Sequence, residues 1–166
     1  MYEQENNQIQ RISKHMYYLD IAKSVAQRGT CIRRNYGSII VKDDLIVSTG
    51  YTGSPRGCVN CCDAGKCARK ELNIPPGERY ELCSSVHSEQ NAIISANRRD
   101  MLGAILYLYC VLPDGSTFKN PEPCLLCKKM ILNSRISEVI TLDVTNMIKI
   151  VKTSEYVKIL DDIKSI

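Results

Sequence analysis

The sequence predicts an α/β protein built as a three-layer α/β/α sandwich, with a mixed central sheet between two layers of helices. A β-hairpin in the N-terminal half is followed by strands that alternate with helices, a pattern typical of a sheet covered by helices. Residues 104–112 (AILYLYCVL) are too apolar and too rich in β-forming side chains for a surface strand, so we expect them near the centre of the sheet. With 166 residues and no repeat or linker, the chain is expected to form one domain, residues 1–166.

A helix and a hairpin are expected first. Residues 16–27 carry apolar side chains at helical spacing, and Gly29 follows as a stop signal. Residues 38–41 and 45–49 are predicted to be strands because both are rich in β-forming side chains. The polar residues 42–44 between them predict the turn of a hairpin.

The middle of the chain contains a loop, an insertion and a helix. Residues 50–55 are a glycine-rich loop, and an insertion over about residues 54–84 holds five of the nine cysteines. Residues 86–96 predict a helix with His87 and Glu89 in its first turn.

The C-terminal part is expected to add a helix and a strand to the sandwich. Residues 125–133 have a helical pattern, and residues 138–144 predict the next strand. The segment from residue 145 has a weaker pattern, with a helix expected near residues 154–163.

The composition is that of an ordinary globular protein, with 44% hydrophobic and 24% charged residues. No apolar run is long enough to span a membrane, and the polar residues 1–10 are unlike a signal peptide, so we expect a cytoplasmic protein without a membrane partner. Nine cysteines in a reducing compartment favour metal binding over disulfides. The net charge of +4 is spread along the chain, which suits a phosphorylated small substrate and gives little support for extended nucleic-acid binding.

Two short motifs predict one catalytic zinc site. His87 offers a nitrogen, and Cys124 and Cys127 of the PCLLC motif offer two sulfurs. Three protein ligands leave the fourth position of a tetrahedral Zn²⁺ open to water, whose pKa zinc can lower to roughly 7. Glu89 is then expected to act as acid and base beside the metal, because it can accept and return a proton. The main alternative is a structural zinc site, which would use four protein ligands.

The motifs also constrain the local geometry. Both cysteines directly precede or begin the helical run 125–133, and a helix N-terminus favours the thiolate. His87 and Glu89 would point to nearly opposite sides of a regular helix. We therefore expect irregular geometry where that helix starts.

The chain resembles the cytidine and deoxycytidylate deaminase superfamily, and most closely its bacterial and phage deoxycytidylate (dCMP) deaminases. The resemblance covers about residues 16–144. It rests on the motifs VHSEQNAI and PEPCLLC, the loop GYTGSPRG, the run RGTCIRRNYGSIIV and the spacer NCCDAGKC…IPPGERYELC. The H-x-E and P-C-x-x-C pair is the signature of zinc-dependent nucleobase deaminases. Two residues depart from the common pattern: Ser88 stands where the family commonly has alanine, and Thr52 where it has an asparagine thought to touch the sugar.

The resemblance implies a cytidine deaminase-like fold and the hydrolysis of dCMP to dUMP and ammonia. A water activated by zinc would attack C4 of the cytosine, while Glu89 protonates N3 and then the departing amine. The nucleotide would contact Thr52 and Asn91, and Arg56 in the glycine-rich loop is our candidate for the phosphate. Family members are usually assemblies, so we expect a homo-oligomer, a hexamer or one based on dimers.

The family pattern also implies a second, structural zinc in the cysteine-rich insertion. Its ligands would be Cys31, Cys61, Cys67 and Cys83, which make a closed tetrahedral set of four sulfurs. The pattern leaves open which of Cys58, Cys61 and Cys62 takes part. The alternative is a set of free thiols in a loop.

Two other classes of function remain open. One is a deaminase of another substrate, such as a tRNA adenosine, a free base, a nucleoside or a pyrimidine intermediate of riboflavin synthesis. A polynucleotide editor needs a basic or aromatic surface beyond its pocket, and this chain has no Trp and a single Phe. The other is a non-catalytic zinc-binding scaffold, which would have no use for Glu89.

Overall fold

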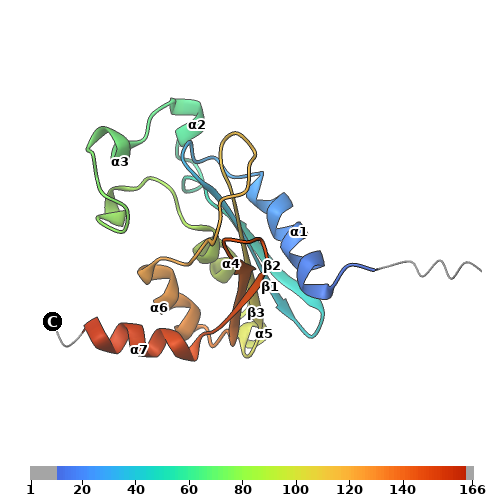
Figure 1. The fold of residues 1–166 in the computed structure, drawn as a ribbon. Coiled ribbons are helices and arrows are strands. Elements are labelled where there is room, and N and C mark those ends of the chain that lie inside the picture. Colours follow the sequence, from blue (N-terminus) through green and yellow to red (C-terminus); the bar gives the residue numbers. More distant parts are fainter. Residues whose placement is uncertain (1–10, 164–166) are drawn as a thin grey trace, which may run out of the picture.

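The computed structural model describes residues 11–163, and a mixed β-sheet lies at its centre (Figure 1). The strand order of this five-stranded sheet is β2-β1-β3-β4-β5, and β3 with β4 is its parallel pair among antiparallel neighbours. The mixed sheet and the central position of β3 confirm the predicted architecture. The strands are β1 (Asn35–Lys42), β2 (Leu45–Tyr51), β3 (Ile105–Val111), β4 (Glu138–Leu142) and β5 (Ile148–Lys152).

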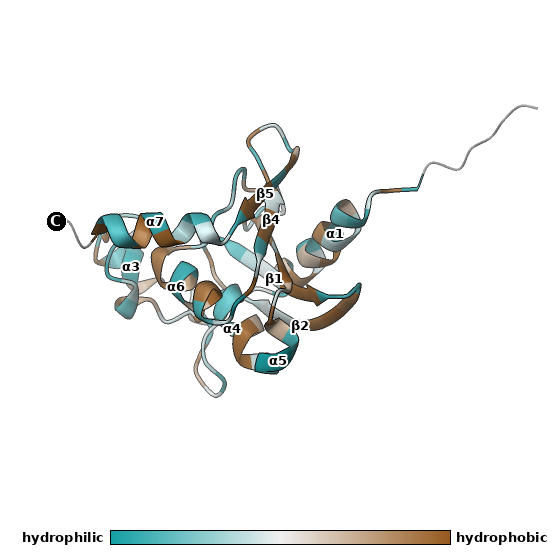
Figure 2. Ribbon diagram, turned by 90° about the horizontal axis from the view of Figure 1, so that it is seen from below, coloured by the Kyte–Doolittle hydropathy of each residue, from teal (hydrophilic) through white to brown (hydrophobic). Residues whose placement is uncertain are grey.

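Helices cover both faces of the sheet (Figures 1 and 2). Helix α1 (Lys14–Ala26) packs on one face against Ile39 and Tyr107, whereas the neighbouring Ile40 and Leu106 point to the other face. This alternation divides the core into two clusters, one on each side of the sheet. The opposite face is covered by α4 (Ser88–Ser95), α5 (Arg98–Met101), α6 (Leu125–Asn133) and α7 (Ser154–Asp162).

The cysteine-rich insertion extends away from both core clusters (Figure 1). It contains short helical turns joined by irregular chain. These turns are α2 (Cys61–Ala64), α3 (Ala68–Glu71) and the 3₁₀ helix η1 (Tyr80–Leu82). None of the helices in residues 11–163 is long and apolar enough to cross a membrane. The expectation for residues 1–10 lies outside the described part of the chain.

The sheet has one strand that was not predicted, β5, and two of its other strands differ from the prediction at one end. The strand expected from residue 38 begins at Asn35, because Gly37 belongs to the strand and does not break it. The strand expected to reach residue 144 ends at Leu142. There the Asp143 carboxylate accepts hydrogen bonds from the backbone N–H groups of Thr145 and Met147, at 2.7 and 3.0 Å, and turns the chain into β5.

Two glycines let helices approach the sheet closely. A Cβ on Gly37 would lie 2.3 Å from the Ala22 carbonyl oxygen of α1. On the other face, a Cβ on Gly50 would lie 2.2 Å from the Ser88 carbonyl oxygen at the start of α4. The position of α4 therefore depends on the absence of a side chain at Gly50.

Candidate active site

His87, Cys124 and Cys127 form a compact cluster where α4 and α6 begin. Their ligand atoms lie within 4.8 Å of one another, and His87 Nδ1 is 3.4 Å from each sulfur. A tetrahedral zinc with ordinary bond lengths would hold a nitrogen and a sulfur about 3.5 Å apart. Among residues 11–163 this is the only group of three or more potential ligands that lie this close. The cluster fits a zinc ion with three protein ligands.

The backbone at His87 supplies the irregular geometry that the motif requires. His87 is the residue before α4, with extended backbone angles (φ −73°, ψ 153°), and so does not lie in the first turn as we had predicted. Because His87 is extended and Glu89 is helical, both side chains line the same cavity. Gln90 supports this conformation, since its Oε1 accepts a hydrogen bond from the His87 backbone N–H at 3.0 Å.

Both cysteines lie at the N-terminus of α6. Cys124 directly precedes the helix with an extended backbone, and Cys127 is in its first turn. A hydrogen bond from Cys127, assisted by His87, lowers the pKa of the Cys124 thiol to about 4 against the opposing effect of burial. The hydrogen bond with Cys124 also raises the pKa of His87. The lowered pKa favours the thiolate form of Cys124, the form that binds metal.

Glu89 lies beside the cluster and is only 3% exposed. Burial raises the pKa of its carboxyl group. Ser88 donates a hydrogen bond to Glu89 Oε2 at 3.0 Å. A buried carboxyl group with a raised pKa is suited to carry a proton near neutral pH.

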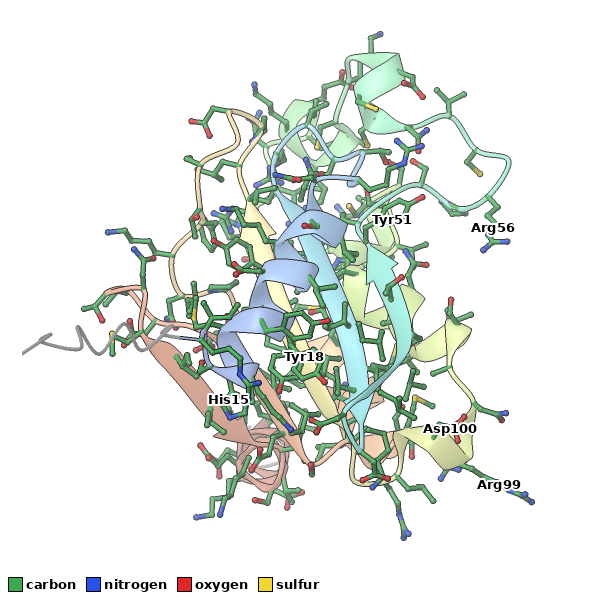
Figure 3. All side chains as sticks on the ribbon, turned by 90° about the vertical axis from the view of Figure 1, so that its right-hand side faces the viewer. His15, Tyr18, Tyr51, Arg56, Arg99 and Asp100 are labelled. Atoms are coloured by element: carbon green, nitrogen blue, oxygen red, sulfur yellow. The ribbon has the colours of Figure 1, made fainter. Side chains whose placement is uncertain are left out.

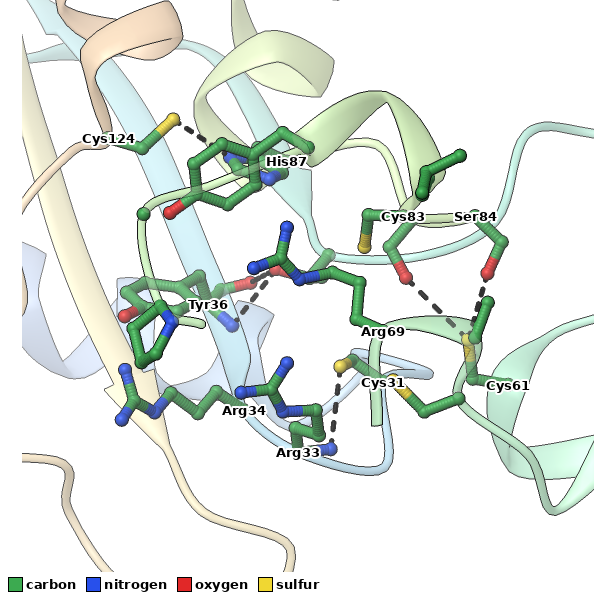
Figure 4. Close-up of a pocket in the computed structure, with 18 of the residues that line it drawn as sticks. Cys31, Arg33, Arg34, Tyr36, Cys61, Arg69, Cys83, Ser84, His87 and Cys124 are labelled. Atoms are coloured by element: carbon green, nitrogen blue, oxygen red, sulfur yellow. Dashed lines mark hydrogen bonds between the residues drawn. The ribbon is translucent and has the colours of Figure 1, made fainter. Parts of the chain in front are cut away.

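The cavity above the cluster is roofed by the cysteine-rich insertion (Figure 4). The buried Arg69 side chain donates hydrogen bonds to the backbone carbonyls of Pro75, at 2.7 Å, and Glu78. Its guanidinium lies 4.7 Å from the centre of the Tyr80 ring, and the Tyr80 ring meets the His87 ring edge to face at 5.2 Å. The insertion therefore contacts a predicted zinc ligand directly. Tyr80 belongs to the spacer that resembles the family and Arg69 lies between its two halves, but neither residue was assigned a role from the sequence.

The predicted substrate contacts divide into two groups. Thr52 is buried and lines the cavity. Asn91 is not in the lining, and its side chain donates a hydrogen bond to the Tyr51 carbonyl at 2.8 Å, which ties α4 to the end of β2. Arg56 is exposed and points away from the molecule (Figure 3), whereas Arg33 and Arg34 line the cavity. The structure does not bring Arg56 and Asn91 to the cavity.

The four cysteines of the predicted second zinc site all line this cavity, but their sulfurs do not form a ligand cluster. Cys61 is buried, and its sulfur lies 3.1 Å from the Ser84 hydroxyl (Figure 4). Cys58 and Cys62 are exposed and outside the lining. The structure therefore favours Cys61 among the three alternatives.

Comparison with known proteins agrees with this geometry. The fold and the cluster together fit the class of zinc-dependent enzymes, with a buried carboxyl group beside the metal site. The sequence matches the cytidine and deoxycytidylate deaminase zinc-binding region over residues 12–143. The chain belongs to this family of deaminases.

Individual relatives support the assignment to the family. A deoxycytidylate deaminase of Mycobacterium phage D29 is 34% identical over 129 residues, which cover 75% of this chain and 90% of the relative. One from Schizosaccharomyces pombe is 32% identical over 130 residues, 78% of this chain but only 37% of the longer relative. A crystal structure of the dCMP deaminase from cyanophage S-TIM5 has the same fold, with a TM-score of 0.56 at 23% identity, covering 81% of this chain and 86% of that one.

Proposed function

We propose that this protein hydrolyses dCMP to dUMP and ammonia. The observation that carries the proposal is the buried Glu89 carboxyl group beside a three-ligand cluster. A structural zinc site needs a fourth protein ligand and has no use for such a carboxyl group. The relatives named above are deoxycytidylate deaminases, and one of them is matched over nearly its whole length.

The chain's own residues account for ligand binding and proton transfer. His87, Cys124 and Cys127 would hold the zinc, which when bound lowers the pKa of a coordinated water. Glu89 would accept the first proton that the water loses and transfer it to N3 of the cytosine ring. It would then take up the second proton of the former water, from the hydroxyl group now bound to C4, and deliver it to the departing amine, so that dCMP and water are converted to dUMP and ammonia.

Two arginines that line the cavity support a proposal for the phosphate contacts. Arg33 and Arg34 line it on the side of β1, and Arg34 lies 4.1 Å from the centre of the Phe118 ring. The Arg69 guanidinium is engaged by backbone carbonyls, so it is less available to a ligand. We therefore propose Arg33 and Arg34, in place of Arg56, as the phosphate contacts, with Thr52 nearer the nucleoside.

An ammonia-release assay tests the substrate directly. Purified protein should be incubated with dCMP, cytidine, cytosine, dCTP, adenine and guanine compounds, and a single-stranded polynucleotide. We expect the largest kcat/KM with dCMP. Faster release from the polynucleotide or from a base without phosphate would contradict the proposed substrate, and no release from any compound would favour a non-catalytic zinc protein.

The tight packing at Gly50 gives a further prediction. Gly50→Ala should destabilise the fold by about 1–3 kcal/mol and also lower kcat, because the added methyl group displaces the start of α4 that carries Glu89. Gly37→Ala is the matched control, since it crowds α1 on the other face. Urea unfolding and kcat should be measured for both variants. Equal kcat values in folded Gly50→Ala and Gly37→Ala protein would contradict the prediction.

We also propose a second, structural zinc bound by Cys31, Cys61, Cys67 and Cys83. What supports it is that all four side chains line one cavity and that four sulfurs suit a closed zinc site. Binding would require the four sulfurs to move closer together than they are in this structure.

We propose that the protein is a homo-oligomer, either a hexamer or an assembly of dimers, that works in the cytoplasm. Large apolar side chains are exposed on α4, α6 and α7, which are surfaces suited to association. The cytoplasmic location rests on the nine cysteines, six of which we propose as zinc ligands, because a reducing compartment keeps such thiols free to bind metal. Light scattering that gave the mass of a single chain, 18.7 kDa, would contradict the assembly, and cell fractionation tests the location. The exposed apolar side chains on α4, α6 and α7 that we propose for the contacts between subunits are Ile94, Leu125, Leu126, Val157 and Ile159.

A further inference from the structure

A chain of two buried hydroxyl groups leads from the sheet to Glu89. The Ser38 hydroxyl of β1 lies 2.8 Å from the Ser88 hydroxyl, which in turn lies 3.0 Å from Glu89 Oε2. Both serines are fully buried, and neither lines the cavity that receives the substrate. Their hydroxyl groups therefore reach Glu89 from within the fold and not from the cavity.

The chemistry of the three groups fixes the direction of this chain. An ionised carboxylate can only accept hydrogen bonds, so Ser88 must donate its one proton to Glu89. The Ser88 oxygen is then left as an acceptor, and Ser38 must be the donor to it. The chain runs from Ser38 to Ser88 to Glu89 whenever Glu89 is ionised.

The two serines are also held rigidly. Ser38 belongs to a strand that is paired on both sides, with β2 and with β3. Ser88 is the first residue of α4, and its carbonyl group packs against Gly50. A hydroxyl group fixed in this way restricts the rotation of the carboxylate that it contacts, which keeps a catalytic group in its productive orientation.

We propose that Ser38 and Ser88 are positioning residues that orient Glu89 for proton transfer. The inference rests on the proposed function, because that function gives Glu89 the role of transferring protons. The Ser88 hydroxyl bonds one carboxylate oxygen, Oε2, and this contact fixes that end of the group. Because the serines lie outside the cavity lining, their loss should change kcat and leave KM unchanged.

Alanine substitution of each serine tests the proposal. Ser88→Ala should lower kcat by about tenfold to a hundredfold, the effect of losing one hydrogen bond to a charged group. Ser38→Ala should lower kcat less, by about threefold, because Ser88 keeps its bond to Glu89. In the Ser88→Ala background, Ser38→Ala should cause no further loss of kcat, since the link is already broken.

Ser48→Ala is the matched control. The Ser48 hydroxyl is also buried and also bonds α4, but it donates to the Ala92 carbonyl at 2.8 Å and does not contact Glu89. This variant should lower Tm and keep the parental kcat. Measuring Tm for all variants separates a loss of stability from a loss of positioning.

The outcomes separate this inference from the proposed function. The activity of the parent on dCMP tests the function alone, whereas the ratio of variant to parent kcat tests the serines on any substrate that the parent deaminates. A parental kcat in Ser88→Ala would overturn the positioning role. So would equal losses of kcat in Ser88→Ala and Ser48→Ala, or losses that multiply fully in the double variant.

Discussion

Replacing Glu89 by glutamine should lower kcat by a factor of about 10² to 10⁴, the contribution typical of a general acid and base. Glutamine has nearly the same shape as glutamate, and its side-chain oxygen can still accept the hydrogen bond from Ser88. It cannot take up and release a proton, so only the proton transfer is lost. Steady-state kcat on the best substrate measures this loss.

The zinc content and Tm of Glu89→Gln should stay at the parental level. Glu89 is not among the three clustered ligands, and a neutral amide at a site only 3% exposed avoids the cost of burying a charge. Glu81→Gln serves as the matched control, since Glu81 is an exposed carboxylate that pairs with Arg79 at 3.3 Å. If Glu89→Gln kept most of the activity, the proposed mechanism would be wrong. If it lost zinc, Glu89 would have to be assigned to the metal.

The residues of the zinc site could be proposed from the sequence, but their geometry could not. His87, Cys124 and Cys127 are chemically distinctive, and few other combinations of residues suit a catalytic zinc. The spacing of His87 and Glu89 also predicted irregular geometry where the helix starts. That His87 precedes the helix in an extended conformation depends on backbone angles that spacing does not determine.

Contacts made by ordinary residues were beyond sequence-based reasoning. Strand β5 was missed because it is a short, partly exposed edge strand that is placed by the turn at Asp143. Arg69 bonds the Pro75 carbonyl within the insertion, and Tyr80 contacts His87. Both contacts depend on the path of the irregular chain in the insertion. An arginine or a tyrosine in such a segment carries no periodic signal, so only the tertiary structure could reveal these contacts.

The cysteine-rich insertion has little apolar burial to hold it in place. Ordering its chain costs roughly 1–2 kcal/mol per residue in conformational entropy. Neither core cluster includes a residue from 54–84, and large apolar side chains there, such as Val59 and Leu72, are exposed. Its buried side chains are Cys61, Cys67, Arg69 and Ile74, two of which are proposed zinc ligands. A closed site of four thiolates could contribute on the order of 10 kcal/mol to folding, which would offset much of that cost.

Cys67→Ser should therefore reduce the zinc content from two ions to one per chain and lower Tm. The catalytic cluster should keep its zinc, because His87, Cys124 and Cys127 lie on other elements. The insertion should loosen, and since it roofs the cavity through Tyr80, KM should rise. Cys58→Ser is the matched control, because Cys58 is an exposed thiol of the same insertion outside the cavity lining, and it should retain both ions. Mass spectrometry of the native protein and thermal unfolding measure these effects. A content of one zinc per chain in the unmodified protein would rule out the second site and leave the four cysteines as free thiols.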